Sequence, residues 1–180
     1  MAQPIRYALI GMAASLALAG GAKSALSSPQ TRAKHIEVAF VLDTTGSMAG
    51  LIDGAKRKIW SIANSIVDIN PNADIRMALI GYRDIGDEYV VKSYKMSDDI
   101  QGLYGNLLRF RADGGGDGPE SVNEALDVAI GDLDWSDSDD VRRIVFLVGD
   151  APPHMDYRDD RKYPETLREA RRRGIIVNTV

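Results

Sequence analysis

The chain has 180 residues and carries 22 basic and 26 acidic side chains, which gives a formal net charge of −4. This length is enough for one α/β domain with a sizeable core, and the acidic balance argues against a general nucleic-acid-binding surface. Cysteine is absent, which excludes disulfides, a thiolate nucleophile and a zinc–sulfur site.

The N-terminus has the pattern of an export signal. Arg6 supplies a short positive region, and residues 8–19 form an apolar run that is followed by small residues suited to cleavage. The run is shorter than the ~20 residues of a membrane span, although an uncleaved N-terminal anchor is an alternative. We expect a signal peptide over 1–22, a flexible linker over 23–34 and one domain over 35–180, exported to the periplasm, the cell surface or the medium.

The first strand of the domain leads into the most informative motif of the chain. Residues 38–42 are continuously apolar, which indicates a strand buried on both faces. Asp43, Thr45 and Ser47 follow at alternate positions of a turn, where three oxygen atoms can point at one spot. Oxygen ligands that include a carboxylate suit a hard divalent cation such as Mg²⁺. The competing interpretation is a helix cap formed by Asp43 or Thr45.

The pattern further along the chain predicts alternating helices and strands. An apolar stripe predicts a helix over 50–69, and we place the basic residues 56–58 on its solvated face. Strands at 74–82 and 88–95 are joined by a short turn, so we expect them to pair antiparallel. Further helices are predicted at 98–110, 119–133 and 164–173, and further strands at 141–148 and 175–180.

This order of elements predicts a Rossmann-like α/β fold. The sheet is expected to be doubly wound, open and mostly parallel, with helices on both faces and one antiparallel edge strand. The apolar strand at 141–148 is expected to be buried on both faces, and Pro119 to be the first residue of a helix. Because the strand at 175–180 lacks a covering helix, we expect the domain to be truncated at its C-terminus.

Three groups of polar residues are predicted at one edge of this sheet. The motif at residues 43–47 follows the first strand, an unusual glycine-rich acidic loop at 113–120 precedes a helix, and Asp150 follows the fourth strand. The first and fourth strands of a doubly wound sheet commonly flank its switch point, where such folds bind ligands. Their ends can therefore face one another, which favours a metal site over the helix cap.

These residues resemble the von Willebrand factor type A domain, in a bacterial and protist form. The run D-T-T-G-S-M from Asp43 is similar to the Asp-x-Ser-x-Ser motif of the family's metal-ion-dependent adhesion site, with Thr45 in the middle place. The run G-D-A-P-P-H is similar to its late acidic loop and supplies Asp150. The resemblance covers nearly all of the predicted domain.

The resemblance implies a bound divalent cation, usually Mg²⁺, with Ca²⁺ or Mn²⁺ as alternatives. Ser47 and Thr45 would approach the ion through their hydroxyls, and Asp43 and Asp150 would bind it directly or through water. It further implies that the domain is not an enzyme. One coordination position stays open for an acidic group of a partner protein, so that the ion docks a ligand and does not catalyse a reaction.

One position departs from the pattern of that family. The family usually has a threonine in the middle loop. Counting back from the pair Ala125-Leu126 puts Glu120 at this position, whereas matching the glycines of the loop puts Asp117 there. Either residue supplies a carboxylate in place of a hydroxyl, which would tighten binding of the metal ion and make Ca²⁺ a more acceptable occupant. The alternative for Glu120 is an acid in the first turn of a helix. The predicted metal ligands are therefore Asp43, Thr45, Ser47, Asp117, Glu120 and Asp150.

A second interpretation is a Mg²⁺-dependent phosphoryl-transfer enzyme. An apolar strand that ends in D-T-T-G-S also resembles the nucleophile motif of haloacid-dehalogenase-type phosphatases, in which Asp43 would take the phosphoryl group. Against it, Thr45 stands where these enzymes need a second acid, and no lysine fits the place that holds the phosphate. The glycine-rich loop also has no role in such an enzyme.

Two other features are weaker candidates. His154 follows two prolines on a loop that we expect to be exposed, and we interpret it as structural. The segment Tyr82-Arg83-Asp84 follows the second strand. It is expected either to pack beside the metal site or to form a hairpin corner held by an Arg–Asp contact.

Overall fold

A computed structural model describes residues 35–180, so the predicted signal peptide and linker lie outside the described residues. No helix in the described range is both long enough and apolar enough to cross a membrane. The elements are β1 (His35–Asp43), η1 (a 3-10 turn, Gly46–Gly50), α1 (Ile52–Ile69), β2 (Asp74–Tyr82), β3 (Val91–Ser97), α2 (Ile100–Arg109), α3 (Val122–Asp127), η2 (a π-helical turn, Val128–Asp132), β4 (Val141–Val148), α4 (Tyr163–Arg172) and β5 (Ile175–Thr179).

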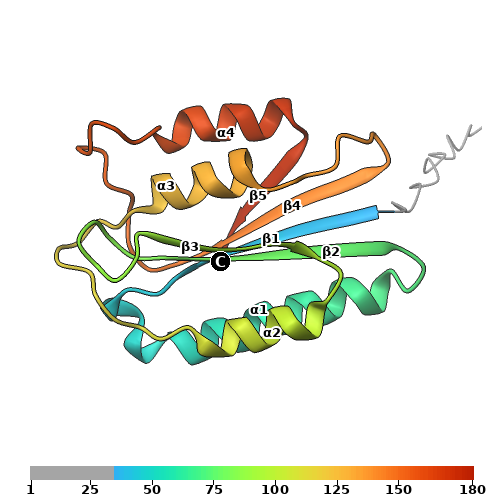
Figure 1. Cartoon of the computed structure of the whole chain (residues 1–180), viewed down its shortest axis with the longest axis horizontal. Coiled ribbons are helices and arrows are strands. Elements are labelled where there is room, and N and C mark those ends of the chain that lie inside the picture. Colours follow the sequence, from blue (N-terminus) through green and yellow to red (C-terminus); the bar gives the residue numbers. More distant parts are fainter. Residues whose placement is uncertain (1–34) are drawn as a thin grey trace, which may run out of the picture. The chain divides into compact units, whose positions relative to one another are not determined.

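The five strands form one mixed sheet in the order β3-β2-β1-β4-β5. β1 pairs in parallel with β2 and β4, β4 pairs in parallel with β5, and β3 is antiparallel to β2. Helices α1 and α2 cover one face, and α3 and α4 cover the other (Figure 1). The doubly wound, mostly parallel sheet with one antiparallel edge strand is therefore confirmed. The strand order reverses between β1 and β4, so the carboxyl ends of these two strands flank the switch point.

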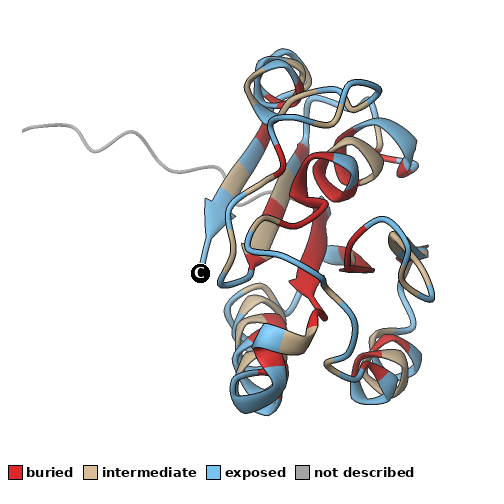
Figure 2. Cartoon of the chain, turned by 90° about the vertical axis from the view of Figure 1, so that its left-hand side faces the viewer, coloured by how far each residue is buried: buried red, intermediate tan, exposed pale blue. Residues whose placement is uncertain are grey.

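The central strand β1 is the most deeply buried element. Every residue from 36 to 43 is buried, because neighbouring strands cover both edges and helices cover both faces (Figure 2). Alternate side chains enter different cores: Val41 packs with residues of α3 and α4, whereas Phe40 packs with residues of α1 and α2. The Phe40 ring also stacks on Phe146 of β4, with ring centroids 5.6 Å apart. This two-sided burial confirms what the continuous apolar run predicted.

The expectation that strand β4 is buried on both faces was wrong. Of its eight residues only Val141, Val145 and Val148 are buried. The core cluster around α1 and α2 includes residues of β1, β2 and β4 but none of β5, and Ile176 of β5 is 54% exposed. A strand is buried on both faces only where both faces are covered. Within residues 35–180, the α1 and α2 layer covers the sheet less completely near β4 and β5.

The side chain of Lys56 on α1 also departs from the expectation. It is 5% exposed, whereas Arg57 and Lys58 are exposed as expected. Lys56 follows Ile52 by four positions and therefore shares its buried face. Its apolar stem is buried while the ammonium group lies 3.6 Å from the carboxylate of Asp53.

The helix expected to begin at Pro119 begins instead at Val122. Glu120 forms an isolated parallel β-bridge with Pro153, and its N–H donates to the carbonyl oxygen of Pro152 at 2.9 Å. Because of this pairing, residue 120 belongs to an extended segment and not to the first turn of the helix. The interpretation of Glu120 as an acid in the first turn of a helix is therefore wrong, and the bridge fixes Glu120 against the loop that follows β4.

Close packing of β2 on the α2 side predicts the effect of one added methyl group. A Cβ atom on Gly81 would lie 2.5 Å from the buried ring of Phe110. We expect Gly81→Ala to lower the free energy of unfolding by about 1–3 kcal/mol through overpacking. Gly105 of α2 has nothing within 4 Å of such an atom, so Gly105→Ala should raise stability by about 0.5–1 kcal/mol. Urea unfolding of both variants checks this, and equal effects would contradict it.

Candidate metal centre

The turn after β1 links four oxygen-bearing side chains. Asp43 is fully buried, and its Oδ1 accepts bonds from the Thr45 amide at 2.9 Å and the Thr45 hydroxyl at 2.7 Å. The hydroxyl oxygens of Thr45 and Ser47 lie 3.1 Å apart. Ser47 in turn donates to Oδ1 of Asp150 at 2.9 Å. The end of β1 and the loop after β4 are thus joined through these side chains.

Thr44 holds this turn in place from the opposite side. Its amide and its hydroxyl donate to the carbonyl oxygen of Tyr82 at 2.9 and 2.8 Å. Its own carbonyl oxygen accepts bonds from the Asp113 amide at 3.0 Å and from Nε of Arg83 at 3.2 Å. Because Thr44 is anchored in this way, its neighbours Asp43 and Thr45 are directed toward the other side of the turn.

The glycine-rich loop packs directly on the turn. The Gly46 amide donates to the carbonyl oxygen of Gly114 at 3.0 Å, and a Cβ atom on Gly46 would lie 2.8 Å from that oxygen. Gly115 has a φ of +75°, and a Cβ atom there would lie 2.9 Å from Oε1 of Glu120 and 3.4 Å from Cβ of Thr45. Glycine at these positions therefore lets the loop approach closely enough to place Glu120 beside Thr45.

Four of the six predicted ligands are linked by hydrogen bonds at the turn, Glu120 lies beside them, and Asp117 does not join them. Glu120 is 2% exposed, and its carboxylate is held beside Thr45 and Asp43. Oδ1 of Asp117 instead lies 3.2 Å from Nε2 of His154. Of the two candidates for the middle loop, Glu120 therefore lies beside the turn and Asp117 lies beside His154. The assignment of Asp43, Thr45, Ser47, Glu120 and Asp150 as metal ligands stays a prediction.

The carboxylates at this site lack positive partners. No ion pair among residues 35–180 includes Asp43, Glu120 or Asp150. Oδ2 of Asp43 and Oε2 of Glu120 are buried without a hydrogen-bond partner. Buried carboxylate oxygens of this kind are costly unless they are paired or coordinate a metal. The set of three carboxylates and two hydroxyls fits Mg²⁺, which prefers oxygen ligands.

Burial and mutual repulsion shift the pKa values of these acids. Burial raises the pKa of Asp43, and the charge of Asp150 adds to this, while the two hydrogen bonds from Thr45 oppose it. Burial, together with the charges of Asp43 and Asp84, raises the pKa of Glu120 to about 7. Burial and the neighbouring Asp43 also raise the pKa of Tyr82 well above its ordinary value. Without a cation, the site therefore resists carrying its full negative charge.

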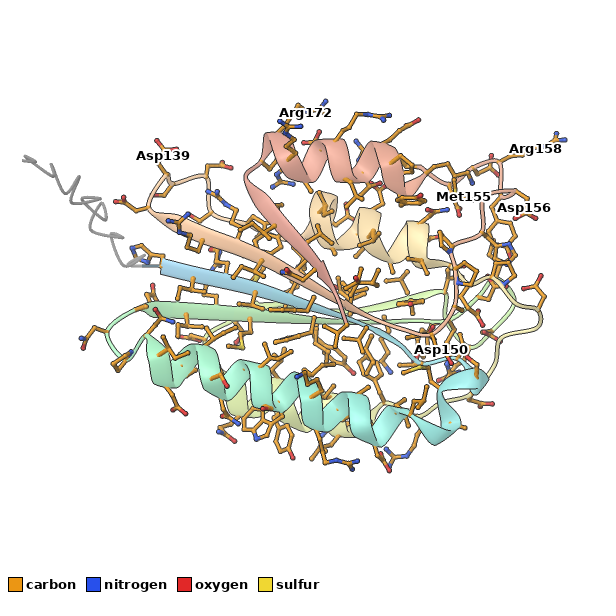
Figure 3. All side chains as sticks on the ribbon, turned by 180° about the vertical axis from the view of Figure 1, so that it is seen from behind. Asp139, Asp150, Met155, Asp156, Arg158 and Arg172 are labelled. Atoms are coloured by element: carbon orange, nitrogen blue, oxygen red, sulfur yellow. The ribbon has the colours of Figure 1, made fainter. Side chains whose placement is uncertain are left out.

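One side of the site faces solvent. Ser47 and Asp150 are exposed, whereas Asp43, Thr45 and Glu120 are buried. Figure 3 shows Asp150 at the end of the sheet opposite to Asp139. The buried acids thus form the floor of the site, and its rim is open to an external ligand.

Two residues that the sequence marks only as weaker candidates support this site. Arg83 is buried and donates to the carbonyl oxygens of Thr44 and Arg111, and its guanidinium lies 3.6 Å from Glu88. Tyr82-Arg83-Asp84 therefore packs beside the site and is not held by an Arg–Asp contact. His154, which we expected on an exposed loop, is 3% exposed. Its burial follows from backbone pairing with Glu120, for which the local sequence gives no signal.

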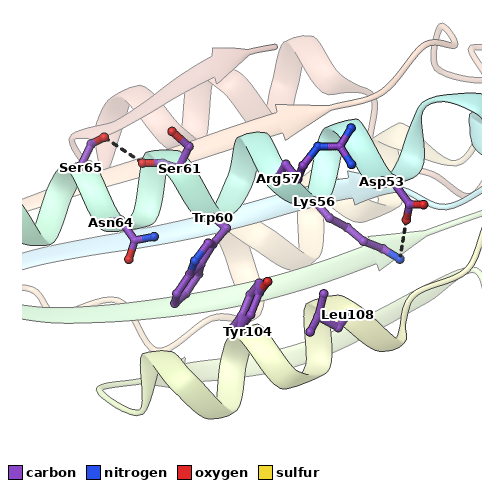
Figure 4. Close-up of a pocket in the computed structure, with 9 residues that line it drawn as sticks. All are labelled: Asp53, Lys56, Arg57, Trp60, Ser61, Asn64, Ser65, Tyr104 and Leu108. Atoms are coloured by element: carbon purple, nitrogen blue, oxygen red, sulfur yellow. Dashed lines mark hydrogen bonds and ion pairs between the residues drawn. The ribbon is translucent and has the colours of Figure 1, made fainter.

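A separate groove lies between α1 and α2 (Figure 4). It encloses about 510 Å³ and is lined by the side chains of both helices, including Lys56. Trp60 and Tyr104 stack in it with ring centroids 4.1 Å apart. None of its lining residues belongs to the metal site, so the groove and the site are distinct features.

Comparison with known proteins identifies relatives of the domain. The family model described as von Willebrand factor A domain matches residues 37–180. The putative ariadne-like RING finger protein R811 of Acanthamoeba polyphaga mimivirus is 32% identical over 123 residues, which are 66% of this chain and 11% of that protein. The alpha-protein kinase vwkA of Dictyostelium discoideum is 28% identical over 120 residues, covering 66% of this chain and 19% of the kinase. The chain thus spans only a small part of these relatives.

Solved structures share the fold at low sequence identity. The pilus adhesin SpaC of Lactobacillus rhamnosus GG matches with a TM-score of 0.58 at 17% identity, over 83% of this chain and 25% of the adhesin. Proximal thread matrix protein 1 of the mussel byssus matches with a TM-score of 0.54 at 16% identity, over 82% of this chain and 35% of the byssus protein. At these identities the likeness shows the fold alone.

The raised pKa of Glu120 predicts how the stability of the metal-free chain depends on pH. The pKa is about 7 in the folded chain and 4.5 ordinarily, so the folded state binds more protons between these values. The free energy of unfolding should therefore fall as the pH rises through this window, by on the order of 3 kcal/mol at most. In the presence of chelator, the stability of Glu120→Gln relative to the parent should increase over the same range. Urea unfolding across this pH range measures it, and a constant difference would contradict the assignment.

Proposed function

The chain belongs to the von Willebrand factor A domain family, and we propose that its domain is a non-enzymatic binding module that docks an acidic group of a partner protein through a divalent cation. The observation that carries this proposal is the hydrogen-bonded set Asp43, Thr45, Ser47 and Asp150 beside Glu120, in which two buried carboxylate oxygens have no hydrogen-bond partner. The family model and the adhesin-like fold agree with a protein-binding role.

In this proposal the ion is Mg²⁺, held at a metal-ion-dependent adhesion site. Asp43 and Glu120 would bind it from the buried floor, Thr45 and Ser47 through their hydroxyls, and Asp150 from the exposed rim. When bound, the ion supplies an electrophilic position for an external oxygen ligand. Three carboxylates also make Ca²⁺ or Mn²⁺ acceptable occupants.

The charge of the site makes partner binding depend on the metal. Asp43, Glu120 and Asp150 together would repel an incoming carboxylate in the absence of a cation. With a divalent ion in place, the same position becomes attractive for an acidic side chain. Because Ser47 and Asp150 are exposed, a partner can reach it from solvent without any movement of the core.

The alternative phosphoryl-transfer function is not favoured. Asp43 is 0% exposed, and its Oδ1 already accepts two hydrogen bonds from Thr45. A nucleophilic carboxylate needs an oxygen that the phosphoryl group can approach. Oδ2 is also buried, so a phosphoryl group, which is much larger than a metal ion, has no open approach to this carboxylate.

We also propose that the domain functions outside the cytoplasm. The support is the export-signal pattern of residues 1–22, together with fold relatives whose names describe a pilus adhesin and a byssus thread protein. The periplasm, the cell surface and the medium are the compartments consistent with such a signal.

Removal of the buried carboxylate charge of Asp43 tests metal binding. Isothermal titration of the chain with MgCl₂ should show one binding event, which Asp43→Asn should weaken by at least about tenfold because a direct or water-mediated ligand is lost. Asp139→Asn is the matched control, since Asp139 is an exposed acid at the opposite end of the sheet. Equal Mg²⁺ affinity in both variants would contradict the proposed site.

Capture of a partner tests the docking role. The immobilised chain should retain a protein from an envelope extract in the presence of Mg²⁺ and release it on addition of chelator. Asp43→Asn should not capture that protein, whereas Asp139→Asn should. Retention that persists in chelator and in Asp43→Asn would show that the interaction does not pass through the ion.

A further inference from the structure

A second group of metal-ligating side chains lies beside the first site and shares no ligand with it. Nε2 of His154 lies 3.2 Å from Oδ1 of Asp117 and 3.6 Å from Oδ2 of Asp84. The three atoms all lie within 4.8 Å of one another. We propose that Asp84, Asp117 and His154 bind a second divalent cation, of the transition-metal class that imidazole ligands select, with Zn²⁺ as the best match.

Two of the three ligands are held rigidly. The Asp84 carboxylate accepts bonds from the Ser121 hydroxyl at 2.8 Å and from the Tyr157 hydroxyl at 2.9 and 3.0 Å. The imidazole of His154 stacks on the ring of Tyr157, with centroids 3.9 Å apart and an interplanar angle of 11°. Both ligands are more than nine-tenths buried. Asp117 supplies the adjustable third ligand, because its side chain is 60% exposed.

The orientation of His154 suits coordination through Nε2. Its Nδ1 lies 2.8 Å from Oδ1 of Asp156. A proton on Nδ1 donated to this carboxylate leaves the lone pair of Nε2 directed between Asp84 and Asp117. Metal-binding histidines typically donate their other ring N–H to a carboxylate in this way, which fixes the tautomer and strengthens the ligand. Asp156 lies at the same end of the sheet as Asp150 (Figure 3).

The separations between ligand atoms match a small coordination sphere. Ligand atoms about 2.0–2.2 Å from a tetrahedral Zn²⁺ ion lie about 3.3–3.6 Å from each other. The two distances from Nε2 of His154, 3.2 and 3.6 Å, lie close to the two ends of this range. An ion could therefore be accepted with a small movement of the exposed Asp117, and the fourth position would be open to water or to an external ligand.

The charge around His154 suits a cation. The carboxylates of Asp84, Asp117 and Asp156 all lie within 3.6 Å of its ring nitrogens, so negative charge surrounds the imidazole. The nearby basic side chains of Arg83 and Lys162 do not neutralise the charge of Asp84. Arg83 points to backbone carbonyl oxygens and Glu88, and Lys162 donates to the carbonyl oxygen of Tyr157.

The full chain has only two histidines, which allows a direct test. On titration with ZnCl₂, the imidazole nitrogen resonances of His154 should shift and those of His35 should not. In isothermal titration, His154→Gln should weaken Zn²⁺ binding by at least about tenfold, and Asp156→Asn by about 10-fold to 100-fold through loss of the orienting partner. The matched control is His35→Gln, since His35 pairs only with Asp74 and lies at the start of β1.

The same titrations separate this site from the first. Asp43→Asn should retain Zn²⁺ binding at Asp84, Asp117 and His154, and His154→Gln should retain Mg²⁺ binding at the first site. If His154→Gln does not fold, Asp117→Asn at the exposed ligand should give the same loss. Zn²⁺ affinity that is unchanged in His154→Gln and Asp117→Asn, or that is lost only in Asp43→Asn, would overturn the proposal. So would an unshifted His154 resonance at saturating Zn²⁺.

Discussion

A buried carboxylate at the end of the central strand is the constraint around which the rest of the structure is arranged. Asp43 has no exposed surface, and only one of its oxygens is hydrogen-bonded, to Thr45. Glu120 adds a second buried carboxylate beside it. A low-dielectric position disfavours both charges, and a divalent cation that approaches from the open rim would relieve them together. The strand order, with its switch between β1 and β4, is what brings Asp150 to the same place.

The short pairing between Glu120 and Pro153 positions both clusters of polar side chains. It ties the glycine-rich loop to the loop after β4, because the Glu120 amide donates to Pro152 and the His154 amide donates to Glu120. The Glu120 side chain faces the first site, and the His154 imidazole faces the second. Two polar clusters of different composition therefore share one backbone framework, with carboxylate and hydroxyl oxygens in one and an imidazole in the other.

The sequence predicted the architecture well where local pattern and final environment agree. The apolar run before Asp43 predicted a buried central strand, and the short turn after β2 predicted antiparallel pairing. Prediction failed where tertiary contacts decide. Pairing with Pro153 displaced the helix start from Pro119, and a thinning helix layer left β4 partly open. The choice between Glu120 and Asp117 likewise depends on which loop each residue contacts, and spacing along the chain does not encode that.

Anomalous diffraction from crystals of the chain grown with MnCl₂ is the most direct test of the proposed metal site, because it locates the ion without reference to activity or partner. Mn²⁺ takes the same oxygen ligands as Mg²⁺. We predict a peak bounded by Asp43, Thr45, Ser47, Glu120 and Asp150, at which the orphaned oxygens of Asp43 and Glu120 gain a partner. Saturating Mn²⁺ with no peak among these residues would contradict it.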